Sequence, residues 1–426
     1  MPNNHIALQG KIANHDEIFY GQIMLDSSLG IIDQVIKRPD KFVSLQQVDM
    51  VYGNNCIIFP GFIDLHVHAR EDPTGQHNYK EDFGSVSRAA INGGVTAIAC
   101  MPNTPDPPIN IETYEKHKKL AEKSLIPVLL YGGISSESRP IGESGRGVPY
   151  KVFLGKTTGN IHFEDYELLD TVLKEYAGCH VSFHCEDPFL LEAYANRKKH
   201  GSRRPPECEE IGIQNCIFLS DQNEIHQKIC HVSTKKGLEL CLQNKTDFEI
   251  TPHHLYFNTQ DMRDDSLMTM NPPLRSEKNR KALLDSIKLS STAYLAHFGS
   301  DHAPHTLEDK KKGAAGVPQE DTAGPFVTWL IQQKVSLENI ARIFAYNPGI
   351  FYSRFDEFKD QKFGKIGAGY VASLTVLNLK KPQKIKNYEL KTKCAWSPFE
   401  GITFPGRVED VYVRGVRYER GVKYDR

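Results

Sequence analysis

The most constraining feature of this chain is a regular alternation between residues 57 and 301. Short apolar runs alternate there with longer amphipathic stretches. We predict eight strands, at residues 62–68, 95–100, 127–131, 151–154, 180–184, 228–232, 247–251 and 296–301. Helices are expected between them, at 80–92, 111–123, 163–176, 234–243 and 277–289.

This order of elements predicts an α/β fold with a parallel sheet, because parallel strands need helical crossovers. Eight strands within about 240 residues favour a closed (β/α)8 barrel of the TIM type. An open doubly wound sheet would usually carry a glycine-rich phosphate loop after an early strand, and this chain has none. We therefore expect a barrel over residues 57–365.

The two flanks of this region have a different pattern. Residues 1–56 and 366–426 contain short β-like pieces, and each flank is too small to bury a good core alone. We expect the two flanks to meet as one small β-sandwich module built from both ends of the chain.

The charges are balanced, with 52 Lys and Arg against 53 Asp and Glu. No net field would attract nucleic acid or an anionic membrane, so neither is expected as a partner. The run Lys310-Lys311-Lys312 is interpreted as a solvated surface loop, with an anion site as the alternative.

The nine cysteines form no Cys-x-x-Cys pair, and their number is odd. This usage is typical of free, mostly buried thiols in a reducing compartment. No apolar signal region and no membrane-length apolar stretch is found in the sequence. We therefore expect a cytoplasmic protein.

Metal-ligating residue types occur at the ends of several predicted strands. His66 and His68 end the first strand, and residues two apart on a strand point to the same face. His184, His231 and Asp301 end the fifth, sixth and eighth strands. Barrel enzymes place their chemistry at this end, and such nitrogen and oxygen ligands suit zinc, with manganese, cobalt or iron as alternatives. The competing interpretation is that polar residues merely cap the strands.

Lys151 lies on the fourth predicted strand, where a buried cation is costly. A neutral amine there could react with carbon dioxide to give a carbamate, an anionic ligand able to bridge two metal ions. An ion-paired or snorkelling lysine is the alternative. Lys156 is the neighbouring competitor, but its glycine-flanked setting is typical of a loop.

Six motifs together resemble the amidohydrolase superfamily and, within it, the dihydroorotases. The similarity extends over residues 60–322. The motifs are Pro60-Gly61-Phe62-Ile63-Asp64, His66-Val67-His68-Ala69-Arg70, Met101-Pro102-Asn103-Thr104, Thr251-Pro252-His253-His254-Leu255, Met270-Asn271-Pro272-Pro273-Leu274-Arg275 and Ser300-Asp301-His302-Ala303-Pro304-His305.

The resemblance implies a role for each matched residue. His66, His68 and Asp301 would bind one zinc ion and His184 and His231 a second, with carboxylated Lys151 bridging the two. Asp301 would also be the catalytic general base and acid. Substrate contacts would come from Arg70, Asn103, Asn271 and His305, and from the backbone at Val317 and Pro318.

The implied reaction is the reversible hydrolysis of the cyclic amide of dihydroorotate to N-carbamoyl-L-aspartate, with ring closure serving pyrimidine biosynthesis. Two ions sharing a hydroxide would provide the nucleophile. The family also implies a possible homodimer. The alternatives are an allantoinase, hydantoinase or dihydropyrimidinase, or a barrel that serves as a non-catalytic scaffold.

Overall fold

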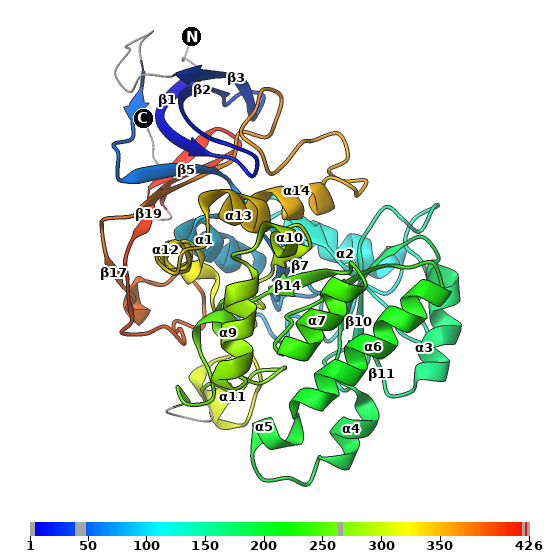
Figure 1. Ribbon diagram of the computed structural model, residues 1–426. Coiled ribbons are helices and arrows are strands. Elements are labelled where there is room, and N and C mark those ends of the chain that lie inside the picture. Colours follow the sequence, from blue (N-terminus) through cyan, green and yellow to red (C-terminus); the bar gives the residue numbers. More distant parts are fainter. Residues whose placement is uncertain (1–4, 39–47, 263–266, 420–421, 424–426) are drawn as a thin grey trace.

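The computed structural model describes residues 5–38, 48–262, 267–419 and 422–423 (Figure 1). Its centre is a barrel of eight parallel strands. They are β6 (Phe62–Val67), β7 (Val95–Cys100), β8 (Val128–Leu130), β10 (Tyr150–Leu154), β12 (His180–His184), β13 (His226–Ile229), β14 (Asp247–Ile250) and β15 (Ala296–Phe298).

Hydrogen bonds between neighbouring strands close this barrel. One arc runs β6-β7-β8 and the other β10-β12-β13-β14-β15, all parallel. β9 (Gly132–Gly133) follows β8 almost directly and pairs with β10, which joins the arcs on one side. A parallel bridge between Val67 and His302 joins them on the other. The predicted (β/α)8 barrel is confirmed.

Helices surround the barrel. The longer ones are α1 (Phe83–Gly93), α2 (Ile111–Ala121), α3 (Tyr166–Leu173), α6 (Pro206–Gln222), α7 (Lys235–Gln243), α9 (Glu277–Ser286) and α12 (Ala323–Gln332). α1 begins later than predicted because Asp82 caps it, accepting a hydrogen bond from the Ser85 amide. The sequence analysis missed α6, whose buried face includes Cys208, Gly212 and Cys216, residues too small to give a clear apolar period.

Shorter elements complete the barrel and its connections. The helices are α4 (Pro188–Ala193), α5 (His200–Arg203), α8 (Pro252–Tyr256), α10 (Ser290–Ala293), α11 (Leu307–Lys311), α13 (Leu337–Ala341) and α14 (Asn347–Tyr352). Single turns are η1 (Lys174–Tyr176), η2 (Glu320–Thr322), η3 (Arg342–Tyr346) and η4 (Asn387–Glu389). Short strands are β11 (His162–Phe163), β17 (Gln383–Lys384) and β18 (Thr403–Phe404).

Both ends of the chain meet in one sheet beside the barrel (Figure 1). Its strands are β1 (His5–Ala13), β2 (Ile18–Asp26), β3 (Ile31–Arg38), β4 (Met50–Val51), β5 (Cys56–Pro60), β16 (Leu374–Asn378), β19 (Arg407–Val413), β20 (Val416–Glu419) and β21 (Val422–Lys423). β5 pairs with β1 on one side and β16 on the other, so the predicted composite module is confirmed.

The module sheet curls back on itself. Ile31 in β3 is bridged to Val371, just before β16, and the Ile32 amide donates to the Tyr370 carbonyl at 2.7 Å. Leu8, Ile23 and Val376 are fully buried in the core that this curvature encloses. Because β5 belongs to this sheet, we propose that the first segment of the module extends to Pro60 rather than ending at residue 56.

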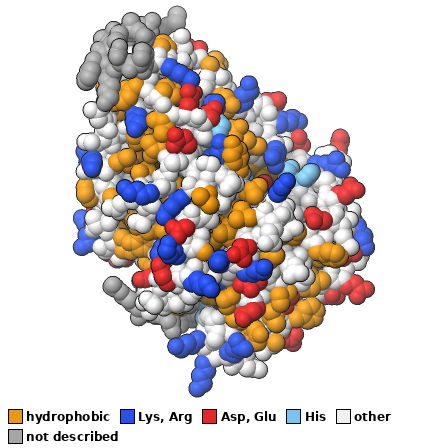
Figure 2. Space-filling model, in the orientation of Figure 1, with side chains coloured by type: hydrophobic (Ala, Val, Ile, Leu, Met, Phe, Trp, Pro, Cys, Tyr) orange, Lys and Arg blue, Asp and Glu red, His pale blue; other side chains and the backbone are white. Residues whose placement is uncertain are grey.

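All nine cysteines are free, and all but Cys394 are buried, as predicted. Among the described residues, no helix combines the length and apolar character needed to cross a bilayer. Figure 2 shows one face of the molecule, on which Lys and Arg side chains are interspersed with Asp and Glu. Charges of one sign do not gather into a single large patch on that face.

Candidate metal centre

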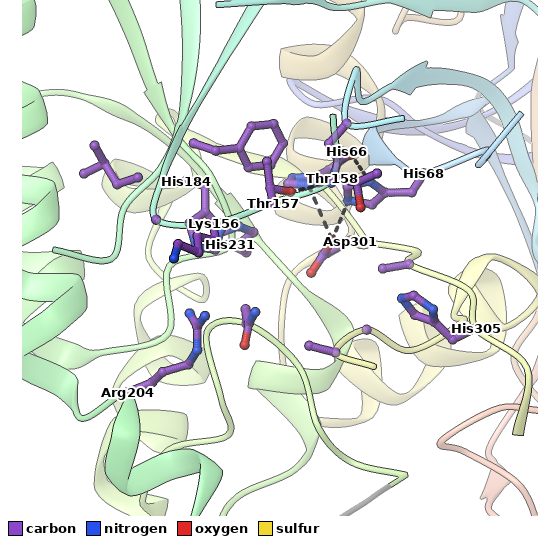
Figure 3. Close-up of a pocket in the computed structure, with 18 of the residues that line it drawn as sticks. His66, His68, Lys156, Thr157, Thr158, His184, Arg204, His231, Asp301 and His305 are labelled. Carbon is purple, nitrogen blue, oxygen red and sulfur yellow. Dashed lines mark hydrogen bonds and ion pairs between the residues drawn. The ribbon is translucent and has the colours of Figure 1, made fainter. Parts of the chain in front are cut away.

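A cavity of about 410 Å³ lies at the carboxyl ends of the barrel strands (Figure 3). Nine of the twelve residues predicted for the site line it: His66, His68, Arg70, Asn103, His184, His231, Asn271, Asp301 and His305. These residues come from segments that are far apart in the sequence, and closure of the barrel brings them together.

The first ligand group is His66, His68 and Asp301, all buried. His66 Nε2 and His68 Nε2 lie 3.4 and 3.1 Å from the same oxygen, Asp301 Oδ1. The other ring nitrogens are occupied: His66 Nδ1 donates to Glu249 Oε2 and His68 Nδ1 to Asn103 Oδ1, each at 2.7 Å. Both Nε2 atoms therefore direct lone pairs toward a carboxylate.

Converging lone pairs in a buried site are unfavourable unless a cation lies among them. Burial lowers the pKa of His66 to about 4 despite the nearby Glu249, and it lowers the pKa of His68 well below its usual range. Both rings are thus neutral near pH 7, the state that ligates metal. The donor set fits one divalent ion, and zinc suits it well.

A second pair of imidazoles adjoins the first group. His184 Nδ1 lies 3.0 Å from His231 Nε2, and the rings of His66 and His231 are 5.2 Å apart between centroids. His184 Nε2 donates to Glu186 Oε2 at 3.0 Å, which leaves His184 Nδ1 free to ligate. Burial holds the pKa of His231 well below its usual range. This pair offers nitrogen ligands for a second ion.

Lys151 is fully buried on β10, close to both ligand groups. Its charge contributes to the lowered pKa values of His66, His68 and His231. Its amine donates to Cys230 Sγ at 2.7 Å, and in the described part of the chain no carboxylate forms an ion pair with it. A carbamate formed on this amine would supply an anionic ligand, which the pair of His184 and His231 lacks.

A third possible group, His66, Cys230 and Glu249, also has its ligand atoms close together. Two observations argue against it. His66 Nδ1 already donates to Glu249, and burial raises the pKa of Cys230 to about 12, so the thiol stays protonated at neutral pH. Nε2 of His66 is therefore the atom that would ligate a metal ion.

Arg70 and His305 line the cavity, and Lys80 lies behind His305. Arg70 is 7% exposed and donates from Nε to the Pro304 carbonyl at 3.3 Å and from Nη2 to His305 Nε2 at 3.2 Å. Lys80 Nζ lies 3.2 Å from His305 Nδ1. Among the described residues, no carboxylate lies within ion-pair distance of Arg70, and burial lowers its pKa to about 10. This part of the cavity favours an anion.

Three of these site residues have left-handed backbone conformations, which non-glycine residues rarely adopt. The φ angles are 62° at Arg70, 37° at His231 and 51° at Asp301. Such a turn cannot continue a strand, so β13 and β15 end before the positions predicted for them. Strained residues of this kind cluster at functional sites.

Val317 and Pro318 are not among the described residues that line the cavity, whereas their neighbours Ala315 and Gly316 are. The Val317 carbonyl accepts from the Ala303 amide at 3.0 Å, and Val317 is bridged to His302. Val317 is therefore buried against the segment that contains His302 and Ala303. Ala315 and Gly316 thus bring this loop to the cavity wall, and the backbone contact expected at Val317 and Pro318 stays a prediction.

The sequence analysis missed three charged residues of the site. Glu249 on β14 orients His66 and forms an ion pair with Lys228, while Glu186 orients His184 and forms an ion pair with Arg204. In Figure 3, Arg204 points into the cavity. Glu186 lies two residues after His184, and this spacing could have suggested that it contacts His184. No pattern in the sequence connects Glu249 or Arg204 with the site.

This fold and site define a class of protein: a (β/α)8 barrel with a buried His, His and Asp metal-ligand group at the carboxyl ends of its strands. The model of the amidohydrolase family matches residues 57–417. The chain belongs to the amidohydrolase family.

Individual relatives cover nearly the whole chain. It is 32% identical to a dihydroorotase of Thermococcus kodakarensis over 97% of this chain and 94% of that protein. It is 31% identical to a dihydroorotase of Pyrococcus furiosus over 96% of this chain and 91% of that protein. An L-hydantoinase (dihydropyrimidinase) structure from Arthrobacter aurescens has a TM-score of 0.86 at 21% identity, covering 99% of this chain and 97% of that one.

Proposed function

We propose that this cyclic amidohydrolase is a zinc-dependent dihydroorotase that interconverts dihydroorotate and N-carbamoyl-L-aspartate. The observation that carries the proposal is Arg70, a buried guanidinium without a carboxylate partner in the described part of the chain, in the lining of the cavity that holds the metal ligands. A planar fork of this kind binds a carboxylate through two hydrogen bonds. Dihydroorotate carries a ring carboxylate, whereas hydantoin, allantoin and dihydrouracil do not.

The comparisons support this choice. Relatives named dihydroorotase match over nearly the full length at 31–32% identity. The hydantoinase structures are only about 20% identical, so their likeness concerns the fold.

The remaining polar groups suit the rest of the substrate. Asn271 Oδ1 is buried and has no hydrogen-bond partner in the described structure, so it can accept from a ring N–H. Asn103 spans two neighbours, accepting from His68 Nδ1 and donating from Nδ2 to Thr157 Oγ1 at 3.0 Å. We therefore assign Asn103 to orienting His68 in addition to the predicted substrate contact.

The chemistry follows from this arrangement. Divalent ions held by the histidines, Asp301 and carboxylated Lys151 would lower the pKa of a water molecule and polarise the amide carbonyl. Asp301 would accept the proton from the attacking water and deliver it to the ring nitrogen as the C–N bond breaks. Arg70 and His305 would hold the carboxylate, so that the amide carbon faces Asp301. In the reverse direction the same groups would close the ring.

The direct test offers the purified, zinc-loaded protein four substrates in parallel: dihydroorotate, dihydrouracil, hydantoin and allantoin. We expect the ultraviolet absorbance of dihydroorotate to fall as its ring opens, with turnover at least 100 times faster than for the uncharged rings. Zinc-saturated protein that opens hydantoin or allantoin but leaves dihydroorotate intact would refute the proposal while keeping the family.

Arg70→Lys is expected to raise the KM for dihydroorotate by roughly 10- to 100-fold, because losing charge-assisted hydrogen bonds costs about 1.5–3 kcal/mol. A point charge cannot reproduce the two parallel bonds of the guanidinium. Initial-rate kinetics measure the effect, and Arg139→Lys, at an exposed position, is the matched control. An unchanged KM in Arg70→Lys would assign the carboxylate to another residue.

A further inference from the structure

Lys310 is a fully buried lysine in α11 of the loop that follows His305. Its two neighbours, Lys311 and Lys312, are exposed, so the predicted solvated surface holds for them and is wrong for Lys310. Lys310 Nζ donates to three backbone carbonyls: Thr269 at 2.7 Å, Ala314 at 2.8 Å and Gly316 at 2.9 Å. These three bonds use all three donors of an ammonium group.

The buried charge of Lys310 is unusual because, in the described residues, no carboxylate forms an ion pair with it. Burial, with a smaller effect from Arg70, lowers its pKa to about 7. A buried cation without an acidic partner is costly, and only the three converging carbonyl dipoles compensate for it here. An apolar side chain would avoid that cost, but it would remove a donor from each of the three carbonyls.

The three carbonyls belong to two separate segments, each of which reaches the cavity wall within a few residues. Thr269 lies two residues before Asn271, which lines the cavity, and Gly316 lines it directly. The Gly316 amide also donates to the Thr269 carbonyl at 2.9 Å, so Lys310 reinforces a junction between these two segments. Movement of this junction would displace Asn271 and Gly316, which line the cavity together with Arg70.

The C-terminal segment supplies a second anchor. Trp396 Nε1 donates to the His305 carbonyl at 2.7 Å, and Lys310 Nζ lies 5.9 Å from the centroid of the Trp396 ring. The backbone of His305 is thus fixed from one side while the loop after it is fixed by Lys310. The bonds of Lys310 and Trp396 to this wall do not involve the predicted metal ligands.

We propose that Lys310 is a positioning residue that sets the substrate-binding wall of the cavity, by tying the loop after His305 to the Thr269–Gly316 junction, with Trp396 as its second anchor. The inference rests on the proposed dihydroorotase function. It predicts that Lys310 governs substrate affinity and leaves metal binding alone.

The test compares Lys310→Met with Lys311→Met, a neighbouring exposed lysine that serves as the matched control. Lys310→Met keeps the length of the side chain and removes its three donors. We expect the KM for dihydroorotate to rise at least tenfold, with kcat within threefold of wild type and zinc content unchanged. Lys311→Met should behave as wild type in all three measurements.

Trp396→Phe provides the second variant, because it keeps an aromatic ring at this buried position while removing the N–H that donates to His305, together with part of the ring volume. We expect a three- to tenfold rise in KM. If Lys310→Met does not fold, this variant tests whether fixing the wall of the cavity governs the KM. A wild-type KM in Lys310→Met, or an equal loss of kcat and zinc, would overturn the positioning role. Failure of the wild-type enzyme to turn over dihydroorotate would instead refute the proposed function.

Discussion

Replacing Asp301 by Asn is expected to lower kcat for dihydroorotate by at least about 10³-fold, the scale of losing a general acid–base group that also ligates metal. Asp301 Oδ1 lies within 3.4 Å of the Nε2 atoms of both His66 and His68, so its charge is central to the site. An amide of the same shape can neither accept the water proton nor return it to the ring nitrogen.

The measurement is kcat at saturating zinc, with zinc content determined by elemental analysis on the same sample. Rates per bound zinc separate proton transfer from ligation, since a variant that only lost metal would recover its rate when fully loaded. Asp285→Asn, on the exposed surface of α9, is the control for a general effect of removing a carboxylate. Retention of more than a tenth of wild-type kcat in Asp301→Asn would remove Asp301 from the proton-transfer role.

Replacing Lys151 by Met is expected to reduce the metal content from about two ions per chain to about one and to lower kcat by at least about 10²-fold, since a second ion contributes to both nucleophile and carbonyl activation. Methionine matches the length of the lysine but cannot form a carbamate. Elemental analysis and initial rates, both at saturating zinc, measure the two effects.

The control is Lys174→Met, 63% exposed at its side chain and not among the residues that line the cavity, which should keep the wild-type metal content. Carboxylation has its own readout, because metal-free wild-type protein should load zinc faster when bicarbonate is present. Lys151→Met should load at the same rate with and without it. Two tightly bound ions in Lys151→Met would show that the bridge is not needed.

Much of the barrel could be predicted because burial leaves a local signature in the sequence. The predicted strands 95–100 and 180–184 match β7 and β12 at both ends, because a mostly apolar run coincides with β7 and an alternation of polar and apolar residues with β12. The predicted strands 228–232 and 296–301 extend too far, because His231 and Asp301 adopt left-handed backbone angles that end the strands. Neither residue type predicts such an angle from the sequence. α6 escaped prediction because small buried residues weaken the apolar period.

The ligand residues of the candidate site were also predictable. His66 and His68 lie two apart at a strand end, His184 ends β12, and His231 and Asp301 follow β13 and β15 at the same end of the barrel. The acids that orient these histidines were not predictable. Glu249 lies 183 residues from His66, and a local pattern contains no information on such a pair.

By itself, the sequence determined the order of strands and helices, the barrel and the types of residue at its strand ends, because periodicity and spacing are local properties. Only the tertiary structure decided which groups meet. It paired Glu249 with His66 and Glu186 with His184, left Arg70 without a carboxylate in the described chain, and placed Lys310 among three carbonyls. Hydrogen bonds and burial act through space, so these contacts exist only once the chain has closed on itself.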